Sequence, residues 1–173
     1  MMDKCCGYLY KTRQGMVNLN IVLLEPEIPQ NTGNIGRTCN AMGAKLHLIG
    51  PLGFSMEDKY LRRAGLDYWK DLNVAYYTDY TDFMLKNPRG QKVYLSRKGS
   101  KRYDLFRYEK EVYLIFGKES VGLPDAMVQE NREVCIRIPM AARTRSLNLA
   151  NTVAILGYEV LRQYDFPGLK IIG

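Results

Sequence analysis

The chain has 173 residues, of which 46% are hydrophobic and 25% are charged, so it can form the core of one domain. No apolar run approaches the ~20 residues that cross a bilayer, and the first residues lack the pattern of a secretory signal. The net charge of +7 favours a polyanionic partner only weakly, because many basic proteins bind no nucleic acid. We therefore expect a cytoplasmic protein without a membrane segment.

The cysteine and histidine content argues against two kinds of site. Cys5 and Cys6 are adjacent, which suits a disulfide poorly, and the chain has no CxxC pair. His47 is the only histidine and lies outside any motif. A four-ligand zinc site and a Ser-His-Asp or Cys-His nucleophile are therefore not expected, and the thiols are predicted to be free in a reducing cytosol.

Taken in chain order, the hydrophobic pattern predicts alternating strands and helices. Residues 1–17 have no clean period, and we interpret them as an extra or disordered N-terminal extension before a single domain over residues 18–173. Strands are predicted over residues 18–24, 45–49, 74–77, 92–95, 112–116 and 134–138, and helices over residues 34–42, 57–64, 80–86, 125–129 and 147–163.

This alternation predicts an α/β fold, with a mainly parallel sheet and helices on both of its faces. Ligands in such sheets bind beyond the carboxyl ends of the strands. The loops that follow the strands are therefore where we expect the chemistry to lie.

The loop after the first strand has the sequence EPEIPQNTGNIGR and is neither a Walker A nor a GxGxxG motif. Gly33 and Gly36 allow close backbone approach, and Arg37 follows one helical turn after Gly33. On this loop alone, Arg37 is better explained by a solvated surface arginine than by a functional one.

Two later loops complete the pattern. Gly117 and Gly122 follow a buried strand and suit a pocket lined by backbone groups, such as an adenine ring requires. Between them, Glu119 could anchor a hydroxyl or a cation, or could compensate the dipole of the next helix. The last loop carries Arg143 and Arg145, and arginines at this edge suit phosphate recognition.

Together and in this order, the loops are specific. The segments EPEIPQNTGNIGRT, LRRAGLDYW, IFGKESVGLP and IPMAARTRSLNLANTVAI resemble the SPOUT methyltransferases. The chain is most similar to the small tRNA (cytidine/uridine-2′-O)-methyltransferases, which methylate the ribose of the wobble nucleotide. The resemblance runs from about Asn18 to Gly168, and the N-terminal extension is its main departure.

The resemblance implies a C-terminal trefoil knot, a homodimer and the cofactor S-adenosylmethionine (AdoMet), with S-adenosylhomocysteine as product and no metal. Tyr158 would then partly face the second subunit. Arg37 and Arg145 are expected at the catalytic centre. The implied RNA-binding residues are Asn31, Arg62, Arg63, Lys98 and Tyr158, and the implied cofactor-binding residues are Leu95, Gly117, Glu119, Gly122, Ile138, Met140, Ser146, Leu147 and Asn148.

The implied chemistry is displacement of a methyl group by a ribose hydroxyl. Arg37 is the candidate proton acceptor by resemblance, but an arginine is essentially always protonated. We therefore expect Arg37 to stabilise the developing alkoxide charge while a phosphate or water takes the proton. The alternatives are methylation of another RNA ribose, a non-catalytic RNA-binding module, or a nucleotide-binding α/β enzyme of another type.

Overall fold

The structure is a computed structural model that describes residues 15–55, 69 and 72–172. Most of the N-terminal extension, the helix predicted over residues 57–64, and Arg62 and Arg63 lie outside the described residues.

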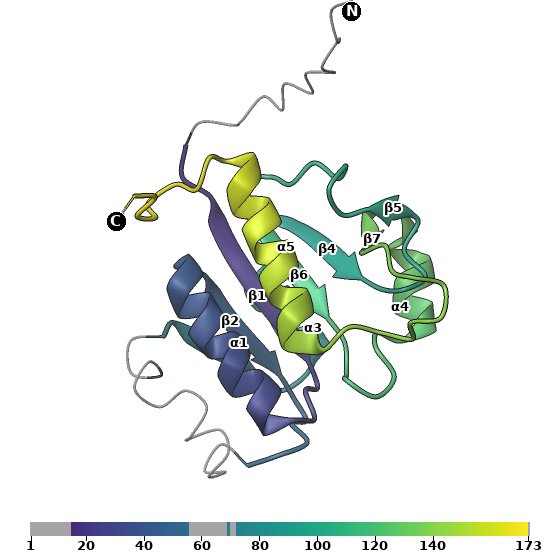
Figure 1. The fold of residues 1–173 in the computed structure, drawn as a ribbon. Coiled ribbons are helices and arrows are strands. Elements are labelled where there is room, and N and C mark those ends of the chain that lie inside the picture. Colours follow the sequence, from purple (N-terminus) through teal and green to yellow (C-terminus); the bar gives the residue numbers. More distant parts are fainter. Residues whose placement is uncertain (1–14, 56–68, 70–71, 173) are drawn as a thin grey trace, which may run out of the picture.

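One sheet of seven parallel strands organises the described part of the chain (Figure 1). The strand order is β3-β2-β1-β6-β4-β7-β5, so the first strand lies in the interior of the sheet. The parallel sheet predicted from the sequence is confirmed. Its strands are β1 (Asn18–Leu24), β2 (Lys45–Ile49), β3 (Val74–Tyr77), β4 (Gln91–Leu95), β5 (Lys101–Arg102), β6 (Glu111–Phe116) and β7 (Cys135–Arg137).

Helices cover both faces of the sheet, as the sequence predicts. Helices α1 (Pro29–Met42) and α5 (Leu149–Gln163) lie side by side on one face (Figure 1). Helices α3 (Tyr80–Lys86) and α4 (Asp125–Glu130) contribute to a separate core on the other face.

The alternation of side chains along β1 explains why its last four residues, 21–24, are all apolar. Ile21 and Leu23 pack in the core beneath α1 and α5, whereas Val22 and Leu24 pack in the core beneath α3 and α4. Successive side chains of a strand point to opposite faces, and both faces of this strand are covered. The buried Asn20 is the polar exception, and its amide is hydrogen-bonded.

Helix α1 is longer than predicted, because it begins at Pro29 rather than at Asn34. Proline fits the first helical position, where its missing N–H has no partner to lose. Gly36 within this helix allows close packing, because a Cβ there would lie 2.9 Å from a ring carbon of Trp69. The predicted end is confirmed at Gly43, which has a φ of 64°.

Helix α5 begins two residues later than predicted. Its cap is Asn148, whose Oδ1 accepts hydrogen bonds from the backbone N–H groups of Ala150 (2.8 Å) and Asn151 (3.4 Å). Ser146, two residues earlier, lies before the helix. An amide at this position satisfies N–H groups that the first turn leaves without partners.

The end of the sheet around β7 also departs from the prediction. Strand β7 begins at Cys135, because a 3-10 turn, η1, occupies Arg132–Val134. The two-residue strand β5 was not predicted; its lysine and arginine lack the apolar pattern of a buried strand.

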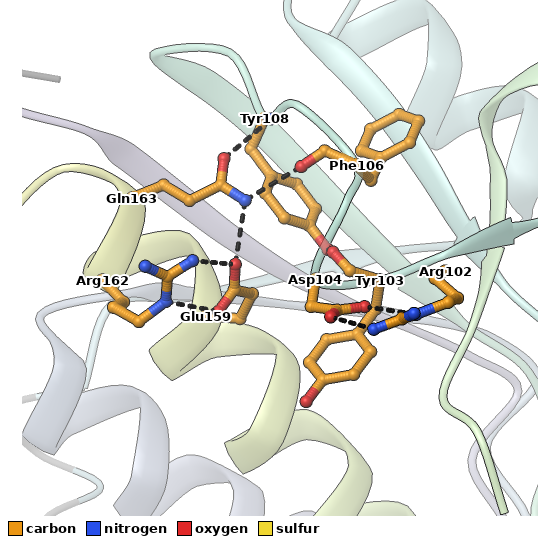
Figure 2. A network of polar contacts seen from close by, with 8 residues as sticks. All are labelled: Arg102, Tyr103, Asp104, Phe106, Tyr108, Glu159, Arg162 and Gln163. Atoms are coloured by element: carbon orange, nitrogen blue, oxygen red, sulfur yellow. Dashed lines mark hydrogen bonds and ion pairs between the residues drawn. The ribbon is translucent and has the colours of Figure 1, made fainter. Parts of the chain in front are cut away.

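A polar network joins the end of α5 to the segment between β5 and β6 (Figure 2). Gln163 donates from Nε2 to the Phe106 carbonyl and to Glu159, both at 2.9 Å, and its Oε1 accepts from the backbone N–H of Tyr108. Glu159 is 8% exposed and forms an ion pair with Arg162 at 2.8 Å. These contacts hold the β5–β6 segment against α5.

His47 is fully buried in the core beneath α3. The Asn20 amide donates from Nδ2 to the carbonyls of Asn18 and Val112, so its Oδ1 must accept from His47 Nε2–H. His47 Nδ1 then accepts from the Tyr77 hydroxyl at 2.8 Å. The ring is therefore the neutral Nε2–H tautomer, and burial lowers its pKa to about 3.

Candidate functional site

A pocket of about 960 Å³ opens at the carboxyl ends of four adjacent strands, β1, β6, β4 and β7. This is the edge at which open parallel sheets bind ligands, and the volume suits a ligand the size of a nucleoside. The three loops singled out in the sequence all reach this edge.

The loop after β6 forms one wall of the pocket. Its glycines allow the two ends of the loop to lie very close together. A Cβ on Gly117 would lie 2.1 Å from the backbone carbon of Gly122, so no other residue fits without moving the loop. Gly122 has a φ of 78°, and its N–H donates to the Lys118 carbonyl at 2.8 Å. The backbone lining predicted for this loop is therefore present.

Most of the expected cofactor-binding residues come together in this pocket. The lining combines apolar side chains and glycines with polar and charged side chains, which fits a flat adenine ring joined to a ribose and a thioether chain. The expected residues that line the pocket are Leu95, Gly117, Glu119, Gly122, Ile138, Met140, Ser146 and Leu147.

The loop before α5 brings Arg145 to the pocket. Its backbone carbonyl accepts a hydrogen bond from Arg97 Nη1 at 2.9 Å, so the loop after β4 supports it. Both arginine side chains, and that of Arg143, are exposed. The guanidinium groups of Arg97 and Arg145 on this rim provide positive charge where an RNA phosphate could approach.

Arg37 lies outside the pocket lining, on the exposed side of α1 and about 12 Å along the helix axis from Pro29 at 1.5 Å per residue. Tyr158 is likewise 43% exposed on α5, outside the lining. The structure thus brings eight of the nine residues expected to bind the cofactor around one pocket, with Asn148 outside the lining, and leaves Arg37 and Tyr158 apart from them.

Lys98 reaches the rim of the pocket but is paired with Asp125 at 2.6 Å. Both side chains are largely exposed, so this ion pair adds little to stability and can exchange for a phosphate contact. The role of Lys98 in binding RNA stays a prediction.

The loop after β1 is joined to the loop after β6 by carboxylates. Glu119 accepts from the backbone N–H groups of Glu27 (2.8 Å) and Ile28 (3.3 Å) and from Asn31 Nδ2 (3.1 Å). Glu27 in turn accepts from the backbone N–H of Ser120 at 3.0 Å. Glu119 therefore faces the first loop, and its assignment to the cofactor stays a prediction.

Three further charged residues, Glu25, Glu27 and Lys118, make contacts at this site that no sequence motif indicates. Glu25 has a φ of 50°, lines the pocket, and forms an ion pair with Lys118 at 2.6 Å. The Glu25 carboxylate raises the pKa of Lys118. These contacts join residues more than 90 positions apart, so only the adjacency of β1 and β6 brings them together.

Within the described ranges, no group of three or more His, Cys, Asp or Glu side chains is placed to hold a metal ion. In the same part of the chain, no helix is long and apolar enough to cross a membrane.

Comparison with known proteins identifies the family. Residues 18–158 match the SpoU rRNA Methylase family. A protein of Geobacillus stearothermophilus is 51% identical over 88% of this chain and 99% of its own length. The tRNA (cytidine(34)-2′-O)-methyltransferase of Escherichia coli K12 is 47% identical over 87% of this chain and 96% of its own length.

Solved structures agree. A structure described as giving insights into 2-OH methylation of C/U34 on tRNA superimposes with a TM-score of 0.82 and 42% identity, over 87% of this chain and 99% of that one. An AdoMet-bound rRNA methyltransferase of Sinorhizobium meliloti superimposes with a TM-score of 0.75 and 28% identity, over 88% of this chain and 59% of that one. With its parallel sheet, glycine-walled pocket and arginine rim, the chain belongs to the SpoU RNA methylase family.

Proposed function

We propose that the protein is a tRNA methyltransferase that transfers a methyl group from AdoMet to the 2′-hydroxyl of the wobble nucleotide, cytidine or a modified uridine. The observation that carries the proposal is the close similarity, over 96% of its length, to the Escherichia coli tRNA (cytidine(34)-2′-O)-methyltransferase. The pocket also supports the proposal, because the residues that line it suit AdoMet.

Within the pocket, the narrow loop after β6 would hold the adenine against the ends of β4 and β7. Gly117, Leu95 and Ile138 offer backbone groups to the ring edge, and Met140 and Leu147 are placed to pack around the thioether chain. Bound there, AdoMet supplies an electrophilic methyl group and leaves as S-adenosylhomocysteine. The chain then has to align the ribose oxygen with that methyl group and exclude water.

The two expected catalytic arginines have separate roles in this proposal. Arg145, on the pocket rim, holds a phosphate of the target nucleotide. Arg37 stabilises the alkoxide charge that develops as the hydroxyl loses its proton to a phosphate or to water. Because Arg37 lies outside the lining, bound RNA must bring the ribose toward α1.

We further propose that the protein acts as a homodimer, with the exposed side of α5 around Tyr158 facing the second subunit. Tyr158 is the large aromatic side chain that this helix leaves exposed, and aromatic residues are enriched at interfaces. Light scattering after gel filtration should give about twice the 19.9 kDa of one chain. A monomer at micromolar concentration would refute this assembly.

The function is tested with two synthetic anticodon stem-loops that differ only in carrying a hydroxyl or a hydrogen at the 2′ position of the wobble nucleotide. With labelled AdoMet, we expect incorporation into the first and none into the second, with mass spectrometry placing the methyl group on the ribose. Equal labelling of both would show that another atom is methylated.

Ribosomal RNA is the main alternative substrate, because the family name and the Sinorhizobium meliloti enzyme both refer to rRNA. Total tRNA and ribosomal RNA from a strain without wobble 2′-O-methylation, offered separately, distinguish the two. Labelling of rRNA alone would replace the proposed substrate. Tight AdoMet binding without transfer to either RNA would favour a non-catalytic binding module.

A further inference from the structure

Helix α1 begins without a cap of its own. Its N-cap residue Ile28 makes no side-chain capping hydrogen bond, and its first turn holds no acidic residue. The first N–H groups of a helix lack intrahelical partners, and the dipole leaves positive charge there. Something outside the helix has to supply the missing acceptors.

Glu119 from the loop after β6 supplies acceptors at and just before the helix start. Its two oxygens accept from the N–H groups of Glu27 and Ile28 and from the side-chain amide of Asn31, which is buried in the first turn. Hydrogen bonds to a charged acceptor are stronger than neutral ones. The loop that walls the pocket is therefore bonded to the start of the helix that carries Arg37.

Glu27 makes the reciprocal contact, from the loop after β1 to the loop after β6. Its carboxylate accepts from the backbone N–H of Ser120, which lies in the same pocket wall. The hydrogen bonds from Ser120, together with the charge of Lys118, hold the pKa of Glu27 below its usual value. Each loop thus binds the backbone of the other through a glutamate, an arrangement that we call the interloop clasp.

The third loop joins the same chain of hydrogen bonds. Asn31 Oδ1 accepts from Asn148 Nδ2 at 3.0 Å, while Asn148 Oδ1 caps α5. One continuous set of contacts therefore runs from Ser120 through Glu27, Glu119 and Asn31 to Asn148. These hydrogen bonds connect the starts of α1 and α5 to the pocket wall.

We infer that Glu27 and Glu119 are positioning residues: the interloop clasp makes the placement of α1, and with it Arg37, depend on the cofactor loop. Neither carboxylate needs to contact the cofactor or the RNA. The inference rests on the proposed function only in giving Arg37 its role in transfer. It predicts that breaking the clasp lowers the rate of transfer more than the affinity for AdoMet.

The test uses the full chain with Glu27→Ala, Glu27→Gln, Glu119→Gln and the Glu27→Ala/Glu119→Gln double variant. We expect kcat to fall about 10-fold or more for Glu27→Ala and Glu119→Gln, since a misplacement of about 1 Å can cost ~100-fold. The fall in kcat should be smaller for Glu27→Gln, because its amide oxygen can still accept a hydrogen bond from the backbone N–H of Ser120. The AdoMet Kd measured by calorimetry should stay unchanged.

The fall in kcat of the double variant should be little larger than that of the more impaired single variant, because both carboxylates hold the same two loops together. The matched control is Glu109→Ala, an exposed glutamate that precedes β6 at the opposite edge of the sheet. It should keep the wild-type kcat.

Three results would overturn the inference. A raised AdoMet Kd in Glu119→Gln with a normal Glu27→Ala would make Glu119 a cofactor ligand. A lower Tm with unchanged kcat would make the clasp merely structural. Fully additive losses in the double variant would mean that the two carboxylates act independently.

A second readout does not depend on activity. Adding AdoMet to the wild type should slow hydrogen exchange of the amides of residues 32–37, and Glu27→Ala should abolish this protection. Equal protection in both proteins would overturn the clasp. If the wild type transfers no methyl group to tRNA, the proposed function fails while this exchange experiment still decides the clasp.

Discussion

Arg37 lies on α1, a helix placed by packing on one side and by the interloop clasp at its start. We predict that Arg37→Ala lowers kcat by about 10²–10³, the loss typical of one preorganised charge donor. The AdoMet Kd should not change, because Arg37 lies outside the pocket lining.

The control for this measurement is Arg89→Ala, an exposed arginine in the turn before β4. Its kcat should match the wild type. Loss of AdoMet affinity in Arg37→Ala would mean that the residue acts on the cofactor instead of on the ribose.

His47 links folding to pH. Its pKa is about 6.5 when unfolded and about 3 when buried, so below pH 6.5 the unfolded chain binds a proton that the fold excludes. The stability from this residue is complete above pH 6.5 and is lost as pH falls toward 3, by up to about 1.4 kcal/mol per pH unit.

Denaturant titrations at pH 5.0 and 6.5 test the link. His47→Gln retains a donor for Asn20 and an acceptor for Tyr77, but it does not titrate. We expect its free energy of unfolding to vary less between the two pH values than that of the wild type. Identical pH dependence in both proteins would assign the effect to other groups.

At the scale of the elements, the loop after β6 has little room for a larger residue at Gly117. A Cβ on Gly117 would collide with the backbone of Gly122 and Leu123. Overpacking costs about 1–3 kcal/mol, which corresponds to a loss of roughly 5- to 150-fold in affinity if the strain falls on the bound state. We therefore predict that Gly117→Ala weakens AdoMet binding in calorimetry by this amount.

The control for Gly117→Ala is Gly43→Asn, a glycine replacement outside the pocket. Gly43 ends α1 with a positive φ that asparagine tolerates, and a Cβ there would meet nothing within 4 Å. Its AdoMet Kd should equal that of the wild type. Unchanged binding in Gly117→Ala would show that the pocket wall opens without cost.

Helix α5 depends on the network around Gln163. Gln163→Ala would leave the Phe106 carbonyl and one oxygen of Glu159 without this donor. We predict a loss of about 1–3 kcal/mol in the free energy of unfolding, with a fall in Tm of about 2–4 °C per kcal/mol. Gln129→Ala, on the exposed side of α4, should leave Tm unchanged in the same thermal scan.

The elements show what the sequence could and could not predict. Strands β1, β2 and β3 begin and end where the hydrophobic pattern predicts, because apolar runs report burial directly. The predicted start of α1 was wrong, since its first turn is polar and the residue before it is held by Glu119, 91 positions away from Ile28. A contact supplied by another loop leaves no local signal.

The candidate site also contains residues that the sequence could predict and residues that it could not. The glycines of the β6 loop and the arginine of the last loop were found from sequence, because each is unusual where it stands. The contacts of Glu25 and Glu27 were missed, since they depend on β6 lying next to β1. The trefoil knot and the dimer are also long-range properties, and both stay predictions.

At the scale of the whole molecule, the charge of +7 bears on RNA binding. Each phosphate contact releases counterions, so we predict that the tRNA Kd rises steeply between 50 and 200 mM salt. Arg145→Ala should reduce the slope of log Kd against log salt by about 0.7–0.9. An unchanged slope would remove Arg145 from the phosphate contacts.

Trp69, the single tryptophan of the chain, packs against Gly36, the residue before Arg37. Its ring is only partly buried, so its fluorescence is sensitive to the distance between α1 and the segment that carries it. The protein therefore contains its own optical reporter for the helix that bears Arg37. A change in emission on mixing with AdoMet or RNA would time the movement of that helix without any label.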